Sequence, residues 1–156
     1  LELRKATEAE SDYLLYEAGE RTTSVEAMAR LVDDTLSEPN STILVACDGE
    51  RLVGFLSARG GTARRNRHAA EIVVAIRDGY RGRGLGRALF EAVEAWALKV
   101  GVTRLGLGHI DRHESAHALY RTMGFREEGR KTPRVLLTDG YAAEVLMAKL
   151  IGASLS

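Results

Sequence analysis

The stretch Arg81-Gly82-Arg83-Gly84-Leu85-Gly86-Arg87 decides how the chain is interpreted, because it joins an apolar run to an amphipathic one. Residues 71–76 before it have the pattern of a strand, and residues 85–100 after it have the apolar spacing of a helix. Glycine at every second position lets the main chain adopt positive φ and turn several N–H groups into one concavity. The free N–H groups of the helix start and the arginines add positive charge. We therefore expect this turn to bind phosphate, most simply a pyrophosphate.

Two other glycine-rich phosphate loops do not fit this spacing. A dinucleotide-binding G-x-G-x-x-G motif that begins at Gly82 needs glycine where Arg87 stands, and no short strand-helix-strand unit with an acidic residue after its second strand follows. A nucleotide P-loop ends in Gly-Lys-Ser/Thr, and Gly84-Leu85-Gly86 does not. The remaining alternatives are a basic loop that contacts RNA, although two Arg-Gly pairs are few for an RNA-binding tract, and simply a helix entry with flexible residues.

The pattern Arg-x-x-Gly-x-Gly at 81–86, between a strand and a helix, resembles the acetyl-CoA pyrophosphate loop of the GNAT superfamily of N-acetyltransferases. Residues 71–76, Glu-Ile-Val-Val-Ala-Ile, are similar to the fourth strand of that family. Residues 116–125, Ala-His-Ala-Leu-Tyr-Arg-Thr-Met-Gly-Phe, resemble its A-x-x-LY-x-x-x-GF segment. The three segments keep the order and spacing of the family, which makes the combination more specific than any one motif.

The resemblance implies an α/β (α+β) fold, in which a mixed, mostly antiparallel sheet of about seven strands is flanked by about four helices. One N-acetyltransferase domain would cover residues 1–156. It would move the acetyl group of acetyl-CoA directly to a primary amine of a small molecule or to a peptide or protein N-terminus. A non-catalytic acyl-CoA sensor would keep the same cofactor residues and is the alternative from another functional class. Homodimers are common among such proteins, so one is compatible with the resemblance.

The resemblance also assigns site residues. Tyr120 stands where many of these enzymes place the tyrosine that protonates the sulfur of coenzyme A. Glu71 matches a position where some members carry a catalytic glutamate, and His109, with an unperturbed pKa near 6.5, is a second candidate base. A water chain is a third option for the base. The implied cofactor-binding residues are Val74, Ala75, Ile76, Arg81, Gly82, Arg83, Gly84, Leu85, Gly86, Arg87, His113, Ala116 and Tyr120.

His113 departs from the family pattern, which usually has an asparagine there to orient coenzyme A. Residues 113–117 also spell H-E-x-x-H, in which two histidines one helical turn apart can share zinc. No histidine follows His117 to act as a third ligand, and Ala116 and Tyr120 belong to the acetyltransferase pattern. We therefore expect no metal site and keep a zinc hydrolase as a remote alternative.

Composition excludes several classes of function. The 22 basic and 22 acidic residues cancel, so no field of the whole protein attracts nucleic acid or a membrane surface. Cys47 is the single cysteine, which excludes an internal disulfide, and its apolar neighbours predict burial. The absence of a signal-peptide core and of an apolar run near 18 residues indicates a cytoplasmic protein.

Hydrophobic spacing and turn residues predict the remaining elements. Two helices are expected early in the chain, the first ended by Gly19 and the second capped by Ser24. A strand that is buried on both faces should precede the glycine turn. The expected strands are 1–5, 42–47, 51–58, 68–76, 103–109, 125–130 and 141–150, with a loop at 131–140 and a helix at 114–123.

Overall fold

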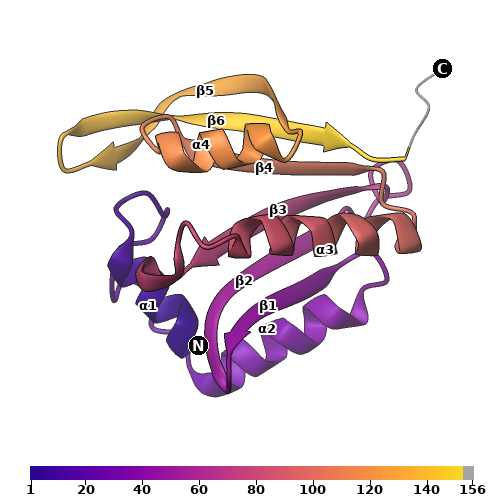
Figure 1. Ribbon diagram of the computed structural model, residues 1–156, viewed down its shortest axis with the longest axis horizontal. Helices are drawn as coiled ribbons and strands as arrows, with labels where there is room; N and C mark the ends of the chain where they lie inside the picture. Colours follow the sequence, from indigo (N-terminus) through magenta and orange to yellow (C-terminus); the bar gives the residue numbers. More distant parts are fainter. Residues whose placement is uncertain (153–156) are drawn as a thin grey trace.

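The computed structural model describes residues 1–152 of the chain, and Figure 1 shows how its helices and strands are arranged. In chain order the elements are α1 (Glu2–Glu10), α2 (Val25–Ser37), β1 (Thr42–Asp48), β2 (Arg51–Gly60), β3 (Ala69–Ile76), the 3₁₀ turn η1 (Asp78–Tyr80), α3 (Leu85–Val100), β4 (Arg104–Ile110), α4 (Glu114–Thr122), β5 (Arg126–Leu137) and β6 (Gly140–Leu150).

The strands form one sheet in the order β1-β2-β3-β4-β6-β5, and every neighbouring pair is antiparallel except β3 and β4. The predicted fold class, a mostly antiparallel mixed sheet with four flanking α-helices, is confirmed. The sheet has six strands among the described residues, because one expected strand is helical. Between residues 1 and 152, every helix is too short or too polar to cross a lipid bilayer.

The sheet splits between its two parallel strands. β3 and β4 pair at only three positions, of which Glu71 opposite Gly106 is the last. Beyond that point β3 stays paired with β2 as far as Ile76, and β4 stays paired with β6 as far as Ile110. Each of the two strands therefore has one backbone edge without a strand partner, and these edges face a gap inside the sheet.

The main hydrophobic core lies between the sheet and helices α3 and α4, which run along it in Figure 1. Phe90 of α3 packs edge-on against Tyr120 and Phe125, with ring centroids 5.6 and 5.4 Å apart. Burial of these large side chains and of the aliphatic residues of β2, β4 and β6 is the main stabilising contribution in this layer. The core therefore holds α4 beside the split in the sheet.

The predictions for residues 1–19 are wrong, whereas the second helix is capped by Ser24 as predicted. Residues 1–5 begin helix α1 rather than a strand, and this helix ends at Glu10 rather than at Gly19. Leu3 and Thr7 are both buried, and their spacing of four fits a strand and a helix equally well, so a window this short did not distinguish the two. The Thr7 hydroxyl donates to the carbonyl of Leu3 inside the helix.

The loop predicted for residues 131–140 is also wrong, because β5 continues to Leu137. Pro133 cannot donate a backbone hydrogen bond, which made a strand improbable by pattern. However, β5 is the edge strand, and the register shifts between Lys131 and Val135, around the proline. Edges and bulges are the positions where a sheet accommodates proline.

Two burial predictions need correction. β3 is not buried on both faces, because Val73 is 55% exposed and Glu71 is also exposed. Ile72, which points to the opposite face, is buried against the core. Cys47 is exposed, since it follows an irregularity in the pairing of the edge strand β1.

Candidate active site

The glycine turn has the predicted backbone conformation. Gly82 and Gly84 have φ values of 70° and 83°, and Gly84 is the N-cap of α3 without any side-chain cap. The first N–H groups of α3 are therefore available to a ligand. Gly86 serves another purpose, because a Cβ atom there would lie 2.8 Å from Cδ2 of Leu119. Its missing side chain lets the start of α3 approach α4.

A cavity of about 460 Å³ lies at the gap in the sheet, between the end of β3, the start of α3 and helix α4. All of the predicted cofactor-binding residues except Arg83 line it. The complete lining consists of Thr7, Ser11, Leu14, Val74, Ala75, Ile76, Tyr80, Arg81, Gly82, Gly84, Leu85, Gly86, Arg87, His113, Ser115, Ala116, Leu119 and Tyr120.

The arginines of the turn differ in their surroundings. Arg81 and Arg87 line the cavity, and Arg81 donates from Nε to the carbonyl of Ile76 at 3.2 Å. Arg83 instead has its guanidinium over the ring of Tyr80, 5.4 Å from the centroid. Two of the three predicted cations thus face the cavity, where they would attract an anion.

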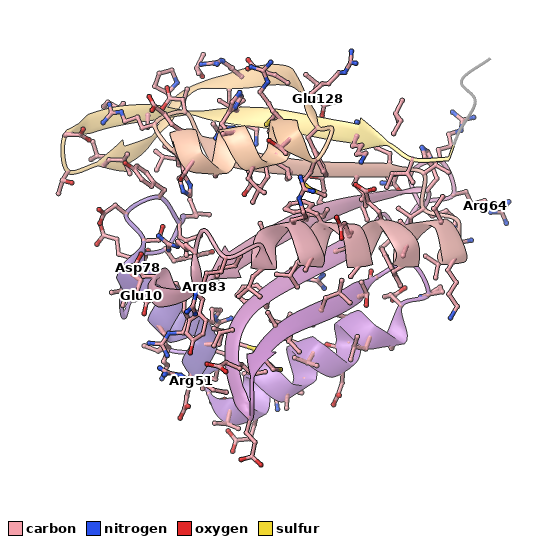
Figure 2. The ribbon with its side chains drawn as sticks, in the orientation of Figure 1. Glu10, Arg51, Arg64, Asp78, Arg83 and Glu128 are labelled. Atoms are coloured by element: carbon pink, nitrogen blue, oxygen red, sulfur yellow. The ribbon has the colours of Figure 1, made fainter. Side chains whose placement is uncertain are left out.

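Helix α1 is fastened to the segment before the glycine turn through Glu10. Its carboxylate accepts hydrogen bonds from the Asp78 N–H at 2.8 Å and from the Arg77 guanidinium at 3.1 and 3.3 Å. Figure 2 shows Glu10 and Asp78 beside one another, with Arg83 nearby. The Asp78 N–H and then Arg77 lower the pKa of the Glu10 carboxyl, so it is ionised at neutral pH.

The N-terminal segment contributes cavity residues that the sequence did not predict. Thr7 and Ser11 line the cavity, and Tyr13 stacks on the His113 imidazole with ring centroids 4.8 Å apart. Arg21 reaches back to the buried carboxylate of Glu8 and so holds the segment after α1 in place. No local motif signals these roles, because they depend on where α1 docks.

Tyr120 lies at the cavity wall, held between aromatic rings. The residue is 8% exposed, and the rings of Phe90, Phe125 and His109 surround its own. Burial raises the pKa of the Tyr120 phenol to about 12. Among residues 1–152 its hydroxyl makes no side-chain hydrogen bond, so this protonated group is available as a donor to a ligand.

Glu71 lies at the point where the sheet begins to split, outside the cavity lining. The residue is exposed, yet its carboxylate lies directly over Gly106, where a Cβ atom would be 2.5 Å from Oε1. Desolvation against the strand raises the pKa of the Glu71 carboxyl, and Arg104 partly opposes this. Such a carboxylate is a better proton acceptor near neutral pH than an ordinary one.

His109 is not brought together with the other predicted catalytic residues. It lies in a second cavity of about 250 Å³, where Nε2 is 2.9 Å from Nδ1 of His117. Its Nδ1 is 2.9 Å from the carbonyl oxygen of Ile110, so both ring nitrogens are occupied. Burial, more than any neighbouring charge, lowers the pKa of His109.

The two histidines of the H-E-x-x-H stretch point to different places. His113 faces the first cavity, where desolvation and then Arg81 lower its pKa. His117 contacts His109 beside the second cavity. The pair therefore lacks the convergence that a zinc hydrolase needs, and no group of three ligand side chains occurs within the described part of the chain.

Comparison with known proteins gives consistent matches. The model of the acetyltransferase (GNAT) family matches residues 6–125. An aminoglycoside N(6')-acetyltransferase type 1 from Stenotrophomonas maltophilia is 32% identical over 103 residues, which cover 62% of this chain and 67% of that protein. An uncharacterised N-acetyltransferase from Mycobacterium tuberculosis is 30% identical over 100 residues, or 64% of this chain and 62% of that protein. The chain thus matches only part of the length of these relatives.

Solved structures match over most of the chain. An acetyltransferase of the GNAT family from Streptococcus pneumoniae superposes with a TM-score of 0.88 at 27% identity, covering 95% of this chain and 89% of that one. A GNAT superfamily phosphinothricin acetyltransferase from Sinorhizobium meliloti, in complex with acetyl-CoA, superposes with a TM-score of 0.83 at 21% identity, covering 97% and 80%. At that identity the second match concerns the fold alone.

Proposed function

Because the chain belongs to the acetyltransferase (GNAT) family, we propose that it transfers the acetyl group of acetyl-CoA directly to a primary amine of a small molecule or a peptide N-terminus. The match to the family model and the acetyltransferase relatives confirm the predicted family and the predicted class of enzyme, an acyltransferase. The observation that carries the proposal is the single cavity that joins the glycine turn to Tyr120 through the gap in the sheet. We further propose that one domain performs the whole reaction.

The glycine turn would hold the pyrophosphate of the donor. Gly82 and Gly84 turn the backbone, the uncapped start of α3 offers N–H groups, and Arg81 and Arg87 add positive charge. The open edge of β3 at residues 74–76 would hydrogen-bond the amides of the pantetheine arm. Their apolar side chains are compatible with this role, because only the backbone of Val74 and Ile76 is required.

Tyr120 would act at the sulfur as it leaves the acetyl group. A phenol with a pKa of about 12 holds its proton throughout the neutral range. The desolvation that raises the pKa of the phenol would also raise the pKa of a thiol at this site above its ordinary value of about 8.5. Tyr120 would stabilise the developing negative charge by donating a hydrogen bond to the sulfur, and the thiolate would then take a proton from the phenol or from water.

Glu71 is the base that the geometry favours over His109. Its carboxylate shares one side of β3 with the exposed Val73, so an amine that approaches this face meets the carboxylate at the start of the split. The carboxylate of Glu144 lies over Gly108, two residues beyond Gly106 on the same side of β4. Glu144 is ion-paired with Lys131 at 3.0 Å, so Glu71 is the carboxylate that would deprotonate the amine, directly or through water.

The name of the relative from Stenotrophomonas maltophilia, an aminoglycoside N(6')-acetyltransferase, supports a small-molecule amine as acceptor. A panel of amino sugars, polyamines, amino acids and peptides should therefore be screened for release of free thiol from acetyl-CoA. Turnover with one class of amine would identify the acceptor. Tight binding of acetyl-CoA without turnover on any amine would instead indicate a sensor.

The test of the donor site reverses the charge at Arg87, which lines the cavity from the first turn of α3. Since hydrogen bonds to charged groups contribute about 1.5–3 kcal/mol, Arg87→Glu should raise KM for acetyl-CoA at least about tenfold. Arg64→Glu is the matched control, because Figure 2 shows Arg64 at the opposite end of the molecule from Arg83. Equal KM values in the two variants would contradict the proposed pyrophosphate site.

A further inference from the structure

We propose that His109 and His117 form a hydrogen-bonded pair that positions Tyr120, with both imidazoles in the form that carries its proton on Nδ1. His117 would then be a positioning residue of the transfer reaction. The inference depends on the proposed function, because it concerns the side chain proposed to donate to the sulfur. It gives His109 a role other than that of a base.

The protonation states follow from the partners of each nitrogen. Nδ1 of His109 is 2.9 Å from the carbonyl oxygen of Ile110, which can only accept, so Nδ1 carries the hydrogen. In the neutral ring Nε2 of His109 is then an acceptor. Nδ1 of His117 lies 2.9 Å from this acceptor and must therefore donate to it. One backbone carbonyl thus places a hydrogen on Nδ1 of both rings and leaves Nε2 of His109 as the acceptor.

A neutral His109 at physiological pH agrees with its surroundings. Burial and the neighbouring His117 lower the pKa of His109. The second cavity also presents Asp111, Glu114, Arg121 and Arg130, acidic and basic groups in equal number. Arg130 further disfavours a charged His109, whereas Glu127 favours one. A proton on His109 Nε2 would point at the Nδ1–H of His117 and break the bond.

The pair reaches Tyr120 through ring packing. The ring centroids of His109 and Tyr120 lie 5.7 Å apart, and the two ring planes make an angle of 50°. The other aromatic rings around Tyr120 are those of Phe90 and Phe125. Because the Tyr120 hydroxyl makes no side-chain hydrogen bond among residues 1–152, packing orients it, and these rings are part of that packing. His109 is the one wall whose own orientation is fixed by hydrogen bonds.

The bond also fastens α4 to β4. His117 precedes Tyr120 by three residues, which places both on neighbouring faces of the helix. Within residues 1–152 the His109–His117 contact is the side-chain hydrogen bond that joins these two elements, and no second one does so. Loss of this bond should let α4 and the Tyr120 ring shift by a small amount, which is enough to weaken a hydrogen bond formed at the reacting sulfur.

The kinetic test uses two substitutions of His117. His117→Ala removes the donor and should lower kcat about tenfold with KM for acetyl-CoA unchanged. His117→Asn places an amide N–H near the position of Nδ1 and should recover most of kcat. In a Tyr120→Phe background His117→Ala should have no further effect, because the two residues act through one hydroxyl. Equal effects of His117→Ala in the two backgrounds would overturn the positioning role.

A spectroscopic test does not depend on activity. Long-range ¹H–¹⁵N NMR of the imidazoles in the wild-type protein at about pH 7.5 should show both rings protonated at Nδ1, with Nε2 of His109 bare. His113→Asn removes one other histidine and aids assignment. A proton on Nε2 of His109, or a bare Nδ1 on either ring, would refute the pair. If these tautomers are found but no amine is acetylated, the pair stands as a structural feature and the proposed function fails.

Discussion

Glu10 links helix α1 to the segment that leads into the glycine turn, and replacing it tests how the donor site is held in shape. Glu10→Ala removes three accepted hydrogen bonds, two from Arg77 and one from the Asp78 N–H. The side chains of the Arg77–Glu10 ion pair are 26% and 25% exposed, so water screens the interaction in part. We expect Glu10→Ala to lower the free energy of unfolding by about 2 kcal/mol.

Chemical unfolding in urea measures this difference directly, and thermal unfolding should show a decrease in Tm of roughly 4–8 °C for a protein of this size. Glu2→Ala is the matched control, since Glu2 is an exposed residue of the same helix. It should change the free energy of unfolding by less than about 0.5 kcal/mol. Glu10→Gln keeps an oxygen for the Asp78 N–H but loses the charge, so its stability should fall between those of Glu10→Ala and wild type.

Acid should abolish the difference between wild type and Glu10→Gln. The pKa of the Glu10 carboxyl is lowered from 4.5 in the folded protein, so its stabilising contribution is complete above that pH. The contribution is lost as the pH falls through the lower folded value. We also expect Glu10→Ala to raise KM for acetyl-CoA. If Glu10→Ala and Glu2→Ala unfolded at the same urea concentration and had the same KM, α1 would have no part in shaping the turn.

Three further predictions address the site. Tyr120→Phe should lower kcat about a hundredfold and leave both KM for acetyl-CoA and Tm nearly unchanged; an unaltered kcat in a thiol-release assay would remove the hydroxyl from the mechanism. Gly84→Ala should destabilise the protein by about 1–2 kcal/mol in urea because φ is 83° there, whereas Gly79→Ala, in similarly open space without positive φ, should not. Burial lowers the pKa values of His109 and His113 from 6.5, so the unfolded chain binds more protons and stability should decrease as the pH falls below 6.5; a flat profile between about pH 5 and 7 would contradict this.

The region from β3 to α4 was predictable because its signals are local. Helix α3 has the predicted bounds, Leu85 to Val100, and left-handed glycines precede and follow it. Glycines at such positions indicate a left-handed backbone conformation from the local sequence alone, independently of tertiary contacts. Val74, Ala75 and Ile76 were predicted from the family resemblance instead, whereas Tyr80, which also lines the cavity, was not predicted.

The contribution of α1 was not predictable, because it depends on contacts between distant parts of the sequence. Glu10 meets Arg77 across 67 positions, and neither residue belongs to a motif. Thr7, Ser11 and Leu14 enter the cavity as a result of this docking. Local patterns indicated a strand here, since five residues do not distinguish a period of two from one of 3.6.

The divergence of His113 and His117 has a definite backbone cause. A spacing of four would place both side chains on one helix face. His113, however, is the N-cap residue, with φ −87° and ψ 71°, so it lies outside the regular helix. Its imidazole stacks on Tyr13, while His117 turns to His109. The H-E-x-x-H pattern therefore does not place its two histidines on one helix face, because its first residue lies outside the regular helix.

Because β3 and β4 pair over so short a distance, the two halves of the sheet are only weakly joined to each other. Three paired positions join the half made of β1–β3 to the half made of β4–β6. Helices α3 and α4 pack across the boundary between these halves. A donor molecule bound along the open edge of β3 would contact this boundary and protect it from solvent. The Arg77 N–H donates to Val53 of β2, so by alternation the N–H groups of Val74 and Ile76 face the open edge. We expect these two amides to exchange with solvent quickly in the free protein and slowly when the donor is bound.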